Sequence, residues 1–96
     1  MAGAAAGRKG RRNEHRTQHL LERLGYHTVR SAGSLGPFDV VGISATEVVL
    51  IQVKTNGWPG THEMETMREF PCPTGTRKVI HRWNDRAYLP VIKEVT

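Results

Sequence analysis

A run rich in valine and isoleucine, GPFDVVGISATEVVLIQVK at residues 36–54, constrains the fold of this chain most strongly. Two apolar segments, 38–44 and 48–53, flank a short polar break, which predicts a β-hairpin. If the turn is centred between Ala45 and Thr46, Asp39 is expected opposite Gln52 on the paired strand. Because side chains alternate along a strand, Lys54 shares the face of Gln52. The hairpin therefore predicts that an acid, an amide and a lysine converge at one of its ends.

The second half of this hairpin carries apolar residues on both faces, which predicts a central strand covered on both sides. These residues are Val48 and Leu50 on the face of Gln52, and Val49, Ile51 and Val53 on the other face. Charged groups at the end of such a strand cost free energy unless they pair, bind a metal ion or meet a ligand. A structural ion pair between Asp39 and Lys54 is the simplest alternative to a functional site.

The length and charge of the chain limit the classes of protein to which it can belong. Its 96 residues suffice for one small domain with one modest core. No apolar run reaches the roughly 18 residues of a membrane span, and the Ala/Gly-rich start lacks the apolar stretch of a signal peptide, so we expect a soluble intracellular protein. The 14 Lys and Arg residues outnumber the 9 Asp and Glu residues, which favours a polyanionic partner. This charge alone does not separate a nuclease from a ribosomal protein or a simple DNA binder.

The single cysteine, Cys72, excludes an internal disulfide, and the Cys and His residues do not show the spacing of a zinc site. Residues 1–10 are expected to form a flexible basic arm, with a single domain at 11–96. Four basic residues gather in or just after this arm, where they are either solvated or in contact with phosphates: Arg8, Lys9, Arg11 and Arg12.

A helix is expected from about Arg11 to Leu24, with Gly25 as its stop. Its predicted buried stripe consists of Leu20, Leu21 and Leu24. Glu14 precedes Leu21 by two helical turns and therefore falls beside this stripe, pointing toward the sheet. The alternative is that Glu14 only compensates the helix dipole.

The remaining elements are shorter. We expect a strand at 26–30, a loop at 31–37, a helix from about His62 to Phe70, and a second hairpin with strands at 78–83 and 88–94. These strands complete the sheet that begins with the 36–54 hairpin. Trp58, in the loop before the second helix, could support a dimer, stack on a bound partner or simply be a partly exposed aromatic residue.

The order of an acid on a first helix, an Asp on a strand and a lysine at the end of the next strand resembles the PD-(D/E)xK nuclease superfamily. More narrowly, four segments resemble archaeal-type Holliday junction resolvases. They are Arg8-Lys9-Gly10 followed by Glu14, the helix end LLERLGY, VRSAGS at Val29 to Ser34, and FDVVG at Phe38 to Gly42. The resemblance extends from Arg8 to Lys54, about half of the chain.

The resemblance implies an α/β (α+β) chain with a restriction-endonuclease-like core, in which helices flank a central mixed sheet of about five strands. It also implies a homodimer that cuts four-way DNA junctions during recombination or repair with Mg²⁺, or Mn²⁺ in its place. Such an enzyme would act in the cytoplasm at the nucleoid, or in the host cytoplasm if it is virus-encoded.

The resemblance also assigns roles. Glu14 and Asp39 would bind the metal ion, and Lys54 would be the catalytic lysine. Gln52 would be a further catalytic residue and a metal ligand. The Val53 backbone carbonyl would be the last metal ligand. The DNA contacts would come from the basic cluster together with three loop residues: Arg8, Lys9, Arg11, Arg12, Arg30, Ser31 and Ser34.

Two positions depart from the resolvase pattern. Gln52 stands where the pattern usually has Glu or Asp, and His15 replaces the arginine that commonly follows the helix acid. An amide oxygen can ligate Mg²⁺ but brings no negative charge, so weaker metal binding is expected. The alternatives are another restriction-like or repair nuclease, or a non-catalytic nucleic-acid binder in which Gln52 marks a decayed metal site.

Overall fold

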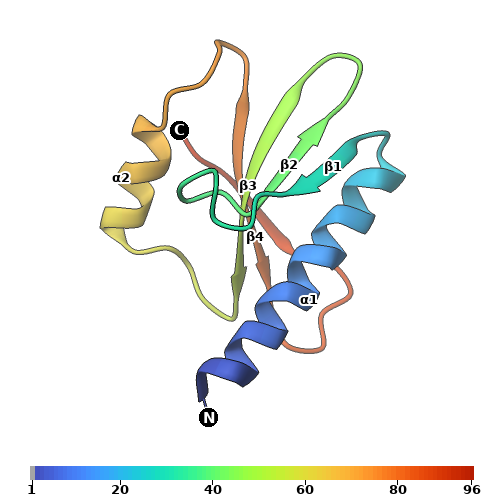
Figure 1. Cartoon of the computed structure of the whole chain (residues 1–96), viewed down its shortest axis with the longest axis vertical. Helices are drawn as coiled ribbons and strands as arrows, with labels where there is room; N and C mark the ends of the chain where they lie inside the picture. The colour runs from blue at the N-terminus through green and yellow to red at the C-terminus, as the bar shows by residue number, and fades with distance from the viewer. Residues whose placement is uncertain (1) are drawn as a thin grey trace.

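The computed structural model describes residues 2–96, with side chains from residue 7 onward. Within this range two helices lie on opposite sides of one five-stranded sheet (Figure 1). The elements in chain order are α1 (Ala2–Arg23), β1 (His27–Arg30), β2 (Val40–Ile43), β3 (Val48–Thr55), α2 (Thr61–Glu69), β4 (Arg77–Trp83) and β5 (Val91–Glu94). Neither helix has the length and apolar character that a membrane span requires in the described part of the chain.

The sheet has the order β1-β2-β3-β4-β5, so the predicted central strand, β3, lies in the middle. β3 pairs antiparallel with β2 and parallel with β4, while both edge strands pair antiparallel with their neighbours. In the first hairpin, Val40 pairs with Ile51 and Ile43 pairs with Val48. This is the register predicted from the position of the turn.

Each face of the sheet has its own apolar core, and β3 contributes to both. On the α1 side, Val49 and Ile51 of β3 pack with Leu21 of α1. On the α2 side, Leu50 packs with Met67 of α2. The alternation along β3 therefore covers the strand on both sides, as the sequence predicts.

The first helix is longer than predicted at its start. It begins at Ala2 rather than near Arg11, so residues 2–10, predicted as a flexible arm, continue the helix. Alanine has the highest helix propensity of all residues, which explains why the Ala-rich start extends α1. Met1, which also belongs to the predicted arm, lies outside the described residues.

The buried stripe of α1 also differs from the prediction. Leu21 is buried, but Leu20 is only half-buried and Leu24 is 67% exposed. α1 ends at Arg23 and the chain turns at Gly25 (φ 96), so Leu24 lies beyond the last turn that packs on the sheet. The prediction for Leu24 is therefore wrong.

Polar residues occupy the rest of the inner stripe of α1. Asn13 donates from Nδ2 to Thr55 Oγ1 at 2.8 Å. Thr17 is fully buried and accepts a hydrogen bond from Trp83 Nε1 at 2.8 Å, while its Oγ1 lies 3.2 Å from His81 Nδ1. These bonds satisfy groups that would otherwise be costly to bury.

The other elements occur close to their predicted positions. α2 covers Thr61–Glu69, close to the expected range of 62–70. β4 and β5 form the second hairpin, although β5 begins at Val91 rather than at Tyr88. Pro90 has no N–H to donate to a strand partner, which is consistent with pairing that starts after it.

Gly42 allows α1 to pack closely on the sheet, and this gives a first prediction. A Cβ at this position would lie 2.9 Å from Val49 Cγ1 and 3.1 Å from Leu21 Cδ1. We expect Gly42→Ala to lower the free energy of unfolding by about 1–3 kcal/mol, measured by urea denaturation. Gly10→Ala, in α1 with no atom within 4 Å of its added Cβ, should keep or raise stability. Equal stability of Gly42→Ala and the wild type would contradict this packing.

His81 should make the protein sensitive to mild acid. Burial, and to a lesser extent the charge of Arg77, lowers the pKa of His81 from 6.5 to about 4. Because the unfolded chain takes up the proton first, the stability due to neutral His81 is complete above pH 6.5 and is lost as the pH falls toward 4. The loss is at most about 3 kcal/mol.

Thermal unfolding across this pH range tests the prediction. We expect His81→Leu to flatten the difference in Tm between pH 7 and pH 4, whereas His62→Leu, at an exposed position on α2, should preserve it. If the difference in Tm between pH 7 and pH 4 is unchanged in His81→Leu, another group causes the loss of stability in acid.

Candidate active site

Asp39 lies just before β2, and main-chain groups hold it there. Its N–H donates to the Ile51 carbonyl at 2.8 Å, and its own carbonyl accepts from the Ser31 N–H at 2.9 Å. Its carboxylate Oδ2 accepts a hydrogen bond from the Val53 N–H at 2.8 Å. The paired ladder begins one residue later, at Val40, so the Asp39 carboxylate contacts the β3 main chain between Gln52 and Lys54.

The surroundings of Asp39 carry an excess of negative charge. Burial is the largest cause that raises the pKa of Asp39, and the charges of Glu14 and Glu63 raise it further. The Val53 N–H and the charge of Lys54 act in the opposite direction without cancelling this rise. Two further carboxylates and one ammonium group thus influence Asp39, and an added cation would favour its ionised form.

Gln52 is 6% exposed and has one end of its amide group satisfied. Its Nε2 donates to Glu63 Oε2 at 3.1 Å. Its Oε1 is buried without a hydrogen-bond partner, the only such side-chain atom in the part of the chain whose side chains are described. A buried acceptor left unpaired lowers the stability of the folded state by about 1–3 kcal/mol. A ligand bound to this oxygen would remove that cost.

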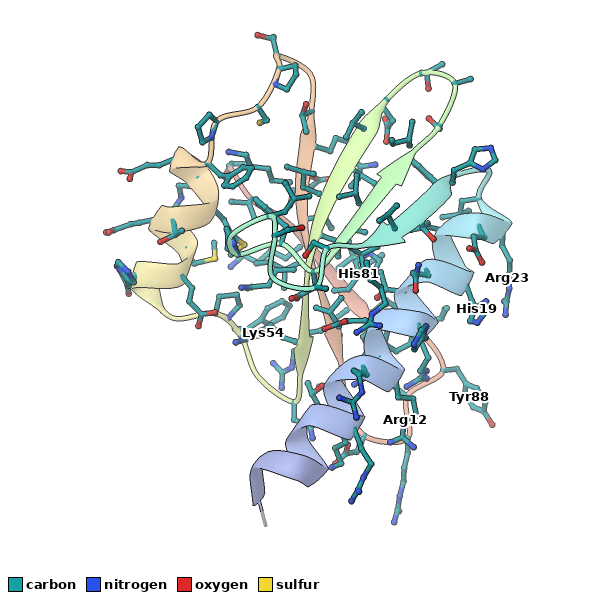
Figure 2. The ribbon with its side chains drawn as sticks, in the orientation of Figure 1. Arg12, His19, Arg23, Lys54, His81 and Tyr88 are labelled. Atoms are coloured by element: carbon teal, nitrogen blue, oxygen red, sulfur yellow. The ribbon has the colours of Figure 1, made fainter. Side chains whose placement is uncertain are left out.

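Lys54 lies on the side of β3 that faces α2 (Figure 2). Its Nζ is 3.4 Å from Glu63 Oε2, and its side chain is 29% exposed. The charge of Lys54 lowers the pKa of Asp39, but its ion pair is with Glu63. The ion pair between Asp39 and Lys54, considered above as the simplest alternative, is thus replaced by one from β3 to α2.

Glu14 points from α1 toward the end of β1, as the sequence predicts for its direction. Its Oε1 accepts a hydrogen bond from Arg30 Nε at 2.9 Å, and both side chains are largely covered. The sequence nominated both residues but did not predict that they pair. Since the charge of Glu14 also raises the pKa of Asp39, the structure brings Glu14, Arg30 and Asp39 into one region.

The loop between β1 and β2 positions Asp39. Ser31 is buried and donates from Oγ to the Phe38 carbonyl at 2.6 Å, while Ser34 donates from Oγ to the Ser31 carbonyl at 2.6 Å. Gly36, with a φ of 54°, takes a conformation that residues with a Cβ rarely adopt. Both serine hydroxyls are thus used within the loop, and their contact with DNA stays a prediction.

The basic cluster of residues 8–12 lies on the exposed surface of the first half of α1. Figure 2 labels Arg12, which belongs to this cluster, and Arg23, which lies at the opposite, C-terminal end of the same helix. Lys9 Nζ is 3.4 Å from Asp85 Oδ1, which ties the helix to the loop after β4. These cations therefore lie on a helix, while the flexibility expected for residues 1–10 stays a prediction.

Sequence reasoning missed Glu63. This residue lies in the first turn of α2, where its Oε1 also accepts from the Gly60 N–H at 3.4 Å. Burial raises the pKa of Glu63, but the Gly60 N–H, Lys54 and Gln52 together outweigh this effect, and the net pKa is lowered. The only sequence signal was an acid near the start of an expected helix, which is common and suggests dipole compensation.

The donor set suits a hard divalent cation. Asp39 and Glu14 offer carboxylate oxygens, and Gln52 Oε1 is a buried oxygen without a donor. Mg²⁺ prefers such oxygen ligands and commonly keeps several waters. Among the residues with described side chains, no three of the His, Cys, Asp and Glu side chains form a cluster that could hold a metal ion. A contribution from the Val53 carbonyl stays a prediction.

The chain was compared with known proteins in three ways. No family model matches it, and no curated protein matches it. Among solved structures, it is similar to Archaeoglobus fulgidus Hjc, a Holliday junction resolvase from an archaeal hyperthermophile, with a TM-score of 0.74 and 23% sequence identity. The alignment covers 91% of this chain and 73% of that chain. The predicted fold, a mixed sheet flanked by helices, is therefore confirmed, and this chain has the fold of an archaeal Holliday junction resolvase.

Proposed function

We propose that this protein is a metal-dependent endonuclease that cuts four-way DNA junctions. The observation that carries the proposal is the buried, unpartnered Gln52 Oε1 beside Asp39 and Lys54, on a fold similar to that of a Holliday junction resolvase. The net charge of +5 favours a polyanionic substrate such as DNA. The chemistry of the site favours hydrolysis of a phosphodiester bond.

Asp39, Glu14 and Gln52 Oε1 would hold Mg²⁺ or Mn²⁺, with the Val53 carbonyl as a further ligand. The bound ion would supply positive charge for the phosphate oxygens and make a water molecule more acidic. The Val53 N–H fixes one oxygen of the Asp39 carboxylate, so this ligand is oriented by the main chain before any ion binds. Such preorganisation lowers the cost of assembling the site.

Lys54 is suited to bind the reacting phosphate. Its ammonium group carries three donors, and it is exposed enough to exchange the Glu63 carboxylate for a phosphate oxygen. Arg30, which is held by Glu14, would contact the DNA backbone next to the site. The row of cations on α1 would bind phosphates further along the duplex and would carry little sequence information.

A four-way junction has two strands to be cut at symmetric positions, and one chain provides one candidate site. A homodimer with two-fold symmetry would place two such sites on one junction, so we include this assembly in the proposal. The functional context would be DNA recombination or repair, in which such junctions arise.

A non-catalytic nucleic-acid binder is the second candidate. Gln52 lacks the charge of the usual acid, and no cluster of three metal-binding acids occurs among the side chains that the structure describes. In this alternative the basic surface would bind DNA without cutting it. The two candidates differ in strand scission and not in affinity for DNA.

Cutting of a labelled junction tests the main proposal. With Mg²⁺ we expect paired symmetric nicks in a four-way junction, no nicks in a linear duplex of matching sequence, and no cutting with EDTA. Asp39→Asn should lower the cutting rate by about 100-fold or more, because it removes a charged ligand. Glu69→Gln, which removes an exposed acid of α2, should cut like the wild type.

Two results would contradict the proposal. Junction binding without cutting in Mg²⁺ or Mn²⁺ would favour the second candidate. Full scission by Asp39→Asn would show that the chemistry occurs elsewhere.

The basic row on α1 predicts how junction affinity depends on salt. Each phosphate contact adds about 0.9 to the slope of log affinity against log salt concentration. We expect the double variant Arg11→Gln, Arg12→Gln to bind the junction more weakly at low salt and to lower the slope by up to about two. Fluorescence anisotropy in EDTA measures this without cutting.

Arg23→Gln, at the far end of the same helix, is the matched control and should leave the slope unchanged (Figure 2). An unchanged slope in the double variant would place the DNA on another face.

A further inference from the structure

Glu63 joins α2 to both polar residues at the end of β3. Its Oε2 accepts from Gln52 Nε2 at 3.1 Å and lies 3.4 Å from Lys54 Nζ. Its Oε1 accepts from the Gly60 N–H, which anchors the carboxylate at the start of α2. The Glu63 side chain is thus held from three directions, and no residue outside β3 and the start of α2 is needed to place it.

The contact with Glu63 decides which way the Gln52 amide points. An ionised carboxylate can only accept hydrogen bonds, so it can receive the NH₂ end of the amide but not the oxygen end. A flipped amide would place Oε1 against the Glu63 carboxylate, where two acceptors repel. Glu63 therefore turns Oε1 away from α2, into the position where it is buried without a partner.

Glu63 also supplies negative charge next to a residue that lacks it. Gln52 is neutral, but the carboxylate of Glu63 lies in direct contact with its amide. The acids Glu14, Asp39 and Glu63 do not themselves form a metal-binding cluster among the described side chains. The contact through which Glu63 can act is its hydrogen bond with Gln52.

We propose that Glu63 is a positioning residue of the metal site: it fixes the Gln52 amide with its oxygen toward the ion and provides from α2 the charge that β3 lacks. This inference rests on the proposed function. It follows from the same contact that Lys54 is held near the site by Glu63 until a phosphate replaces the carboxylate. In this arrangement Gln52 is the neutral ligand, and Glu63 orients it and supplies the negative charge.

Metal binding without DNA tests this role separately from cutting. Mn²⁺, which can be followed by electron paramagnetic resonance, is titrated into the wild type and into Glu63→Gln. We expect the variant to bind Mn²⁺ about 10- to 100-fold more weakly, the usual effect of removing a residue that supports a metal ligand. The control is Glu65→Gln, which removes an exposed acid from the same helix and should leave the affinity unchanged.

The exchanged pair Gln52→Glu, Glu63→Gln shows whether the two residues act as one unit. It keeps the total charge and a hydrogen bond between positions 52 and 63, but it moves the acid onto β3. We expect this double variant to bind Mn²⁺ at least as tightly as the wild type. If it binds no better than Glu63→Gln alone, Glu63 does not act through position 52 and the proposal is wrong.

A second measurement guards against a purely structural effect. The side-chain NH₂ signals of Gln52 in a ¹H–¹⁵N spectrum, identified by their absence in the exchanged pair, should shift when Mg²⁺ is added. In Glu63→Gln the same shift should require about 10-fold more Mg²⁺ while the backbone signals show an intact fold. Equal Mg²⁺ dependence in the two proteins would overturn the proposal.

The outcomes separate this inference from the proposed function. If the wild type binds no Mn²⁺, both the metal site and the role of Glu63 are refuted. If the wild type binds Mn²⁺ but does not cut junctions, the proposed function fails and the role of Glu63 is judged by the affinities alone. If the wild type cuts junctions and Glu63→Gln binds Mn²⁺ like the wild type, only the role of Glu63 is refuted.

Discussion

The hydrogen bond from the Val53 N–H to the Asp39 carboxylate is the contact on which the candidate site depends. It joins the residue just before β2 to the point on β3 where apolar residues give way to polar ones. Because a main-chain group orients this carboxylate, Lys54 is free to form its ion pair with α2. Burial opposes ionisation of Asp39 while the Val53 N–H favours it, so the acid is held in place but remains short of positive charge.

One helix covers each face of the sheet, and this explains why acidic side chains reach the candidate site from both sides. α1 packs on one face and brings Glu14 to the end of β1, while α2 packs on the other face and brings Glu63 to the end of β3. Both helices are fixed by apolar contacts some distance from the acids, such as Leu21 on α1 and Met67 on α2. The core therefore sets the spacing of the acids, and the site itself does not have to supply the energy that holds the helices.

The sequence predicted the parts of this arrangement that depend on neighbouring residues. The register of the first hairpin follows from its turn, and the central position of β3 follows from apolar residues on both of its faces. The direction of Glu14 toward the sheet was also predicted, but the individual partners in contacts between distant elements were not. Leu24 has the right spacing for the core but lies past the end of α1, and Thr17 is buried with its hydroxyl satisfied by a hydrogen bond from Trp83. Glu63 is similar: only the crossover from β3 through α2 to β4 brings it back over Gln52.

The glutamine on β3 can be understood from the charges around it. An acid at position 52 would lie against Glu63 and close to Asp39, which already responds to the charges of Glu14 and Glu63. Adding a further carboxylate there would raise the pKa of Asp39 again and work against the ionised form that a cation needs. An amide avoids this repulsion, keeps an oxygen available and donates to Glu63 at its other end. In a site with an acid on α2, glutamine is therefore a coherent choice, and its presence does not by itself indicate that metal binding has been lost.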